Sequence, residues 1–74
     1  MRLKEYLDSL EPGGHKIFAR KLRVSPSFLS QMASGTASIS PARCVEIELI
    51  TEGTVTRRDL RIDWVSIWPE LQVA

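Results

Sequence analysis

The sequence contains few residues that could cross-link a small fold or bind a metal. Cys44 is its one cysteine and His15 its one histidine among 74 residues. One cysteine excludes an intrachain disulfide, and these two side chains are too few for a structural zinc site. We therefore expect no metal and no cofactor, and a fold held by helix packing, by dimerisation, or by both. A free cysteine is typical of a reducing cytoplasm, and we expect Cys44 to be packed rather than reactive.

Long apolar runs are also missing. The N-terminal residues are not followed by the apolar stretch that a signal peptide needs. Residues 24–42 carry no charge, but Pro26, Gly35, Pro41 and six serines within them exclude a membrane span. A chain of this length has room for one domain, residues 1–74. We expect a soluble cytoplasmic protein with neither a membrane partner nor a small-molecule ligand.

Apolar spacing and capping signals divide the first half of the chain into three helices. A stripe at i, i+3, i+4 and i+7 predicts the first helix, with Leu3, Tyr6, Leu7 and Leu10 on one face. The second helix is predicted over about residues 14–22, and its inward residues are Ile17, Phe18 and Leu22. Ser25 followed by Pro26 predicts the start of a third helix, about residues 26–34, which Gly35 ends.

Two patterns compete in the following segment. Ser40 followed by Pro41 predicts another helix start, and Ala42, Val45 and Leu49 would form a helical stripe. Residues 45–49 also alternate strictly, as in a strand, and residues 52–53 could turn a hairpin over about residues 44–56. The start signal favours the helix, and therefore an all-α fold of about five short helices. The alternative is an α+β fold with a C-terminal hairpin.

The C-terminal part carries weaker helix signals. Thr56 and Asp59 have the spacing of a capping box, which predicts a short helix from about Arg57. Asp63 could cap a last turn that holds Trp64 and Trp68 on one face. We expect these two tryptophans either to cover the domain's own core or to form a dimer contact.

The second and third helices have the spacing of a helix-turn-helix. Only residues 23–25 separate them, and the small residue Ala19 lies where two crossing helices approach most closely. Apolar residues occupy the positions where the two helices must pack, namely Phe18, Leu22, Val24, Leu29 and Met32. The pattern predicts a DNA-binding motif over about residues 14–34, with residues 26–34 as the recognition helix.

Several segments resemble the Cro-like phage repressors that are grouped with the YdaS-type antitoxins. They are residues 3–7 (LKEYL), 24–31 (VSPSFLSQ), 34–35 (SG), 40–43 (SPAR), 55–61 (VTRRDLR), 63–64 (DW) and 67–71 (IWPEL). The resemblance implies a lambda-repressor-like helix-turn-helix domain from a bacterial cell or a phage. It also implies a transcriptional repressor that binds a near-palindromic operator as a dimer.

One position departs from the family pattern. The family usually has glycine in the turn, four residues after the alanine, whereas this chain has Arg23. That place in the turn tends to need a left-handed backbone, which costs a non-glycine residue about 1 kcal/mol. We expect Arg23 to compensate by reaching a DNA phosphate.

The exposed face of the predicted recognition helix has no charge, which is unusual for a solvent-facing helix. An amide or a hydroxyl can bond base edges, and an aromatic ring can contact a thymine methyl. The candidate base-contacting residues are Ser27, Phe28, Ser30, Gln31 and Ser34. Simple solvation of the serines, and a place for Phe28 in the core or at a dimer contact, remain open.

Phosphate contacts are expected from basic and hydroxyl side chains around that helix. The candidates are Lys16, Arg20, Arg23, Ser25, Thr36, Ser38 and Arg43. Arg43 is notable because it falls in the first turn of a predicted helix, where a positive charge opposes the helix dipole. A plain solvated face is the alternative for these residues.

These patterns predict a sequence-specific double-stranded-DNA-binding transcription regulator, not an enzyme, that forms a weak homodimer either in solution or only on DNA. An antitoxin-like or activator role stays open, as does a protein-interaction module that uses Trp64 and Trp68 without DNA. The net charge of +1 suits DNA binding only because it is an average. Residues 1–43 hold seven basic and three acidic residues, whereas residues 44–74 hold three basic and six acidic ones. Non-specific affinity should therefore be modest.

Overall fold

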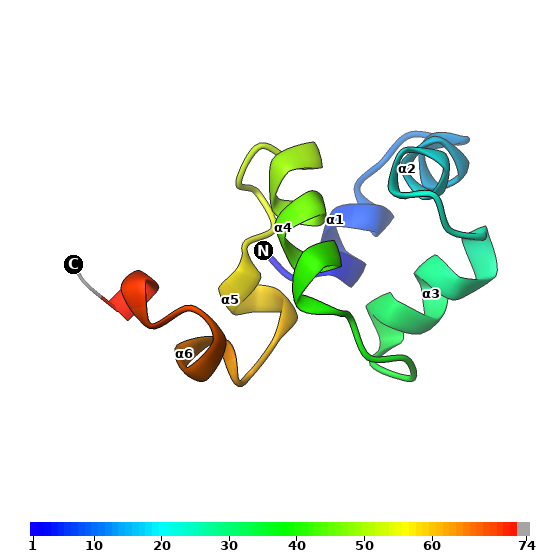
Figure 1. Ribbon diagram of the computed structural model, residues 1–74. Helices are drawn as coiled ribbons and strands as arrows, with labels where there is room; N and C mark the ends of the chain where they lie inside the picture. The colour runs from blue at the N-terminus through cyan, green and yellow to red at the C-terminus, as the bar shows by residue number, and fades with distance from the viewer. Residues whose placement is uncertain (73–74) are drawn as a thin grey trace.

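The computed structural model describes residues 1–72, and every element in that range is helical (Figure 1). The α-helices are α1 (Leu3–Asp8), α2 (Gly14–Leu22), α3 (Pro26–Ser34), α4 (Pro41–Ile50), α5 (Arg57–Leu60) and α6 (Trp64–Ile67), and a 3-10 helix, η1 (Pro69–Gln72), follows. The predicted all-α fold is confirmed, with six α-helices rather than about five. The hairpin alternative is wrong, because α4 includes residues 44–50 and no strand occurs within residues 1–72.

The predicted capping residues start and stop the helices. The Ser25 hydroxyl accepts a hydrogen bond from the Phe28 N–H at 3.1 Å, and the Ser40 hydroxyl accepts one from the Arg43 N–H at 3.3 Å. Gly35 ends α3 with φ = 86°, a left-handed conformation that glycine adopts without strain. The first helix is shorter than its apolar stripe and ends at Asp8. These local signals therefore define most helix ends.

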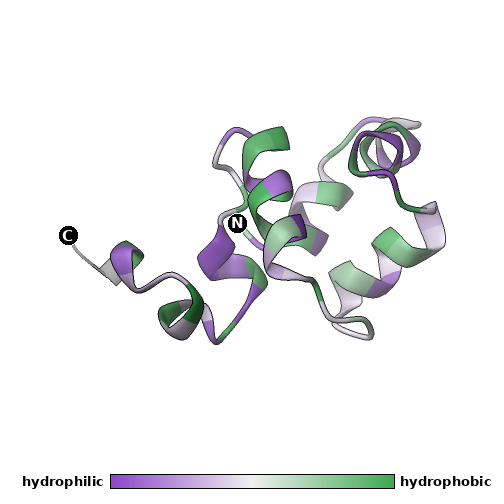
Figure 2. Ribbon diagram, viewed as in Figure 1, coloured by the Kyte–Doolittle hydropathy of each residue, from purple (hydrophilic) through white to green (hydrophobic). Residues whose placement is uncertain are grey.

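The core lies between α1, α2, α3 and α4. Its most deeply buried large side chains are Leu29, Cys44, Ile47 and Val55, and the other buried apolar residues are Leu3, Leu7, Phe18, Ala19, Leu22, Met32 and Ile39. In Figure 2, hydrophobic and hydrophilic residues follow one another along α3 and α4. Burial of Cys44 confirms that it is packed, and desolvation raises the pKa of its thiol, which disfavours the thiolate form.

Two apolar assignments are wrong. Ile17 was expected to face inward, but it is 54% exposed, because Phe18 and Leu22 turn the adjacent face of α2 to the core. In α4 the expected stripe leaves Ala42 exposed and Leu49 71% exposed. The core instead takes Cys44 and Ile47, with Thr51 one turn further on.

The C-terminal helices extend away from this body. In Figure 1, α6 and η1 lie to one side of α1–α4, and the molecule measures 38 × 21 × 18 Å along its principal axes. Both tryptophans are half-buried: the Arg57 guanidinium lies 5.3 Å from the Trp68 ring centroid, and the Arg58 guanidinium lies 4.6 Å from that of Trp64. Trp68 also packs against the core. The expected side-chain cap by Asp63 is not formed, because its carboxylate pairs with an arginine instead.

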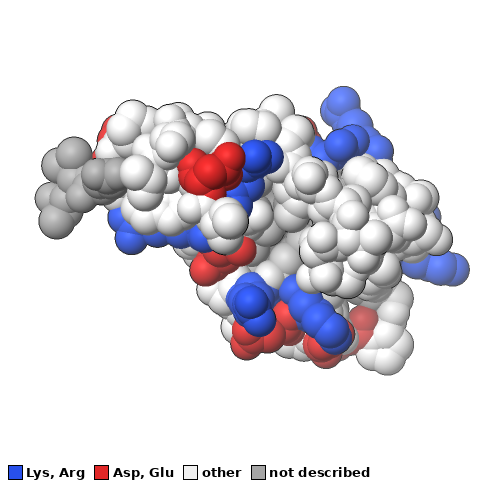
Figure 3. Space-filling view, turned by 90° about the horizontal axis from the view of Figure 1, so that it is seen from below, with Lys and Arg blue, Asp and Glu red and all other residues white. Residues whose placement is uncertain are grey.

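No helix within residues 1–72 has the length and hydropathy that a bilayer crossing requires. One part of the surface carries no charged side chains (Figure 3). Seen from below in Figure 3, the surface over α3 at the right is white, and lysine and arginine groups border it.

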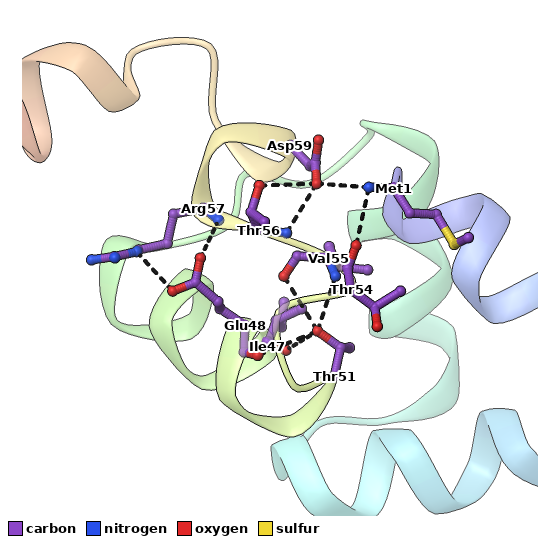
Figure 4. Close-up of polar contacts among 9 residues, drawn as sticks. All are labelled: Met1, Ile47, Glu48, Thr51, Thr54, Val55, Thr56, Arg57 and Asp59. Carbon is purple, nitrogen blue, oxygen red and sulfur yellow. Dashed lines mark hydrogen bonds and ion pairs between the residues drawn. The ribbon is translucent and has the colours of Figure 1, made fainter. Parts of the chain in front are cut away.

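The junction of α4 and α5 is held by polar contacts (Figure 4). The buried Thr51 hydroxyl donates to the Ile47 carbonyl at 2.8 Å and accepts from the Val55 N–H at 3.1 Å. Asp59 completes the predicted capping box, accepting from both the N–H and the hydroxyl of Thr56 at 2.9 and 3.0 Å. The amino group of Met1 lies 3.0 Å from the same carboxylate. Glu48 accepts the Arg57 N–H at 3.0 Å and pairs with its guanidinium.

Candidate nucleic-acid interface

The turn between α2 and α3 has the geometry that the sequence predicts. Arg23 adopts φ = 63° and ψ = 41°, which is the left-handed region, so the expected left-handed conformation is confirmed. The Arg23 N–H donates to the Arg20 carbonyl at 3.1 Å, and the Val24 N–H donates to the Ala19 carbonyl at 3.0 Å. These two bonds close the end of α2 and turn the chain sharply into α3.

Close packing fixes α3 against α2. Ala19 is 1% exposed, as expected for the small residue at the crossing of the two helices. Phe18 and Leu22 of α2 and Leu29 and Met32 of α3 are all buried in the same core. The opposite face of α3 is consequently presented to solvent in one defined orientation, as a recognition surface requires.

The solvent face of α3 is polar and uncharged. Ser27, Ser30, Gln31 and Ser34 are exposed. Within residues 1–72 no hydrogen bond engages the side-chain amide of Gln31, which leaves its donor and acceptor available to a base edge. The Ser34 hydroxyl donates to the Gln31 carbonyl at 3.1 Å and lies 3.0 Å from the Thr36 hydroxyl. Ser34 is therefore less available for base contact than Ser27 or Gln31.

Phe28 occupies a different position from the other four candidates. Its ring is half-buried, packs against the core, and has the Arg43 guanidinium 5.3 Å from its centroid. This placement favours the packing alternative for Phe28. The same contact brings the positive charge of Arg43, from the first turn of α4, to the side of α3.

The other phosphate candidates surround this face. Lys16 and Arg20 are exposed on α2 and line a depression of about 300 Å³ that Val24 and Pro26 close on the side of α3. The remaining candidates, Arg23, Ser25, Thr36 and Ser38, are exposed in the segments that precede and follow α3. Ser25 accepts the capping hydrogen bond through its oxygen, so its hydroxyl hydrogen can still be donated.

His15 helps to hold α3 against α2, although it is not among the residues predicted for the interface. It is half-buried, and its Nε2 lies 3.3 Å from the Pro26 carbonyl oxygen and 3.4 Å from the Ser30 hydroxyl. It thereby connects the first turn of α2 to the N-terminal turn of α3. The available signal was its spacing: His15 precedes Ala19 by four residues, which places both on the side of α2 that faces α3.

Arg61, which is also not among the predicted residues, holds the loop after α3. The Arg61 guanidinium donates to the Ile39 carbonyl at 2.7 Å and to both carboxylate oxygens of Asp63, at 2.8 and 2.9 Å. The hydrogen bonds from Arg61 lower the pKa of Asp63. No local pattern predicts a contact between residues 22 positions apart.

Within residues 1–72 no group of three His, Cys, Asp or Glu side chains is arranged to hold a metal ion.

Comparison with known proteins agrees with the resemblance seen in the sequence. A family model described as "Bacterial toxin YdaS" matches residues 9–67, which include all of α2 to α6. The protein named "Putative transcriptional regulator YdaS" from Escherichia coli (strain K12) is 41% identical over 54 residues. That alignment covers 70% of this chain and 55% of the relative, so the chain spans about half the length of the curated relative that it matches. The chain belongs to the YdaS family.

Proposed function

We propose that this protein binds double-stranded DNA sequence-specifically and regulates transcription. The observation that carries the proposal is the uncharged, exposed face of α3, held rigidly on α2 and flanked by Lys16, Arg20 and Arg23. A helix face without charge suits close approach to base edges, while the basic border suits the phosphates on each side. The name of the E. coli relative, a transcriptional regulator, supports the same role.

Base reading is assigned to the exposed residues of α3. Gln31 can pair with adenine through two hydrogen bonds, because its amide supplies one donor and one acceptor in the required geometry. Ser27 lies one turn earlier on the exposed side and can bond a neighbouring base or phosphate. Ser30 and Ser34 are secondary candidates, because His15 and Thr36 lie within hydrogen-bond distance of their hydroxyls.

Phosphate contacts orient the domain on the duplex. We expect Lys16 and Arg20, which line the depression beside α2, to bind one strand, and Arg43, which lies over the Phe28 ring, to bind a phosphate on another side of α3. We expect further phosphate contacts from the segments before and after α3, through Arg23, Ser25, Thr36 and Ser38. These interactions supply affinity without selecting sequence, and they weaken as salt concentration rises.

The finer proposal is a Cro-like repressor of a bacterial cell or phage that acts in the cytoplasm without a cofactor. Two copies bind the two halves of a near-palindromic operator and block a promoter by occupying it. A transcriptional reporter that carries the operator separates repression from activation. Growth of cells that express the chain tests the description of the family as a toxin. An antitoxin-like role is tested by asking whether the chain rescues cells from the toxic product of an adjacent gene.

Selection of bound duplexes from a random-sequence pool tests the proposal directly. The wild-type protein is expected to enrich a short sequence with two related half-sites. A gel shift with the DNA that flanks its own gene then asks whether a natural site contains that sequence. Absence of enrichment would contradict DNA reading by α3 and would favour a protein-interaction module built on Trp64 and Trp68.

A further inference from the structure

A fully exposed isoleucine stands out on the side of the molecule next to the C-terminal end of α3. Ile62 has no part of its side chain covered, although it lies in the described body rather than at a chain end. Single exposed apolar residues are ordinary on protein surfaces. Ile62 differs because its backbone is held and because grooves lie on both sides of it.

The segment that carries Ile62 is held by its neighbours in sequence. Arg61 forms two hydrogen bonds to the carboxylate of Asp63, which makes a bridge across Ile62. The third hydrogen bond of the same guanidinium goes to the Ile39 carbonyl and attaches the bridge to the loop after α3. The charges of Arg61 and Asp63 compensate each other, so the residue between them is presented as an apolar projection with little net charge around it.

The two grooves share an apolar lining. One has a volume of about 500 Å³ and the other about 520 Å³, and both are lined by Met32, Gly35, Ile39, Leu60 and Ile62. The second groove continues to Leu3 in α1 and Ala33 in α3. Its rim carries Arg2 and Lys4 together with Asp59, so charges of both signs border it.

We propose that this face is the contact between two copies of the chain, with Ile62 of each copy entering a groove of the other. This inference rests on the proposed function, in which two copies bind one operator. A projection and a recess side by side on one face suit a two-fold symmetric contact, because each copy then gives and receives the same group. The net charge of +1 adds little repulsion between copies.

The size of the face predicts a weak dimer. A stable interface buries about 800 Å² per partner, and the whole molecule exposes 5016 Å². We expect one isoleucine and the rims of two grooves to bury less than that area. The contact therefore acts mainly on DNA, where binding of the first copy raises the effective concentration of the second. Because Met32 and Gly35 belong to α3 and its cap, the contact couples directly to the recognition helix.

This assignment moves the dimer contact away from the tryptophans. Trp64 and Trp68 each lie beneath an arginine of α5 and are partly used within the chain. Ile62 is the apolar residue of the C-terminal part whose side chain is fully available.

The test compares three variants of the full chain. Ile62→Asp places a charge on the projection, Ile62→Val keeps it apolar, and Leu49→Asp is the matched control. Leu49 is 71% exposed on α4 and lines neither groove. Both positions are exposed, and circular dichroism and melting curves establish that each of the three variants is folded before binding is compared.

The first readout needs no DNA. Amide chemical shifts of the wild-type chain are followed by NMR as its concentration is raised, and the expected changes gather at residues 35–39 and 60–63. They disappear in Ile62→Asp and persist in Leu49→Asp. Changes that gather instead around Trp64 and Trp68 overturn the inference.

The second readout uses the selected duplex and a duplex that contains one half-site. Ile62→Asp is expected to lose roughly 10-fold to 100-fold in affinity for the full site and nothing for the half-site, because one anchor of the contact becomes charged in each copy. Ile62→Val and Leu49→Asp bind both duplexes like the wild type. If Ile62→Asp keeps full-site cooperativity, the proposed face is wrong although DNA binding stands. If the wild type selects no duplex, the proposed function fails instead.

Discussion

Replacement of Arg23 by glycine separates the stability of the α2–α3 turn from its role on DNA. Arg23 holds φ = 63° and ψ = 41°, a region that costs an L-residue about 1–2 kcal/mol. Glycine removes that strain. Its greater conformational freedom, however, stabilises the unfolded chain by about 0.4–1 kcal/mol. The net expectation is a gain of about 0.5–1 kcal/mol, or a rise in Tm of about 2–8 °C for a domain of this size. The two backbone bonds that close the turn do not involve the side chain.

Two further variants make the result interpretable. Arg23→Ala removes the guanidinium but keeps the left-handed strain, so its Tm should stay close to that of the wild type. Glu52→Gly relieves the other non-glycine residue with positive φ, at 53°, in the turn after α4. Glu52 lies outside the proposed interface, so this variant is expected to raise Tm without changing DNA affinity.

Thermal melting by circular dichroism and a salt-dependent binding titration provide the measurements. Both Arg23 variants should weaken DNA binding equally and lower the salt slope by about one, as loss of one phosphate contact does. A Tm of Arg23→Gly at or below that of the wild type would refute the strain argument. Full affinity in Arg23→Ala would remove the phosphate contact, whatever happens to stability.

Four other predictions follow from the same contacts. Gln31→Ala should cost about 1–3 kcal/mol at one base position and relax specificity there, measured by binding to a panel of single-base variants of the selected duplex. Lys16→Ala should weaken binding to all sequences alike and reduce the salt slope, and a sequence-dependent loss would contradict this. Thr51→Val should destabilise the fold by about 1–3 kcal/mol in denaturant unfolding, because the buried Val55 N–H loses its acceptor. Burial pushes the pKa of Asp59 upward, but hydrogen bonds and the N-terminal amino group outweigh it and the net pKa is lowered. The stability from this carboxylate is therefore present above the ordinary value of about 3.9 and lost as pH falls through the folded pKa, so Asp59→Asn should flatten the acid limb of a stability-pH curve.

Much of the fold followed from residues that act on their immediate neighbours. Ser25, Ser40 and Gly35 define helix ends through bonds or dihedral angles within a few positions, so their effect is readable in one dimension. The same is true of the Thr56 capping box. The left-handed turn at Arg23 was expected for a different reason, the resemblance to a family with glycine there.

The face that each helix buries was less predictable. The sequence of α4 contains two apolar stripes. The spacing predicts that the stripe with Leu49 faces the core, whereas the structure buries Cys44 and Ile47. Ile17 was likewise placed inside although it is exposed. The sequence of a short helix with apolar residues on several sides does not determine which side faces the core. The elements that pack against the helix decide which side is buried.

The sequence by itself determined that the chain is helical, where most helices begin and end, and that an uncharged face lies on the third helix between basic neighbours. These properties depend on backbone propensity, capping and composition, which act over one or two helical turns. Only the tertiary structure decided that Arg43 covers Phe28, that His15 joins α2 to α3, and that Arg61 reaches Ile39 and leaves Ile62 projecting between two grooves. Such contacts join residues 11 to 22 positions apart, and their geometry exists only after the core has set the angles between the helices.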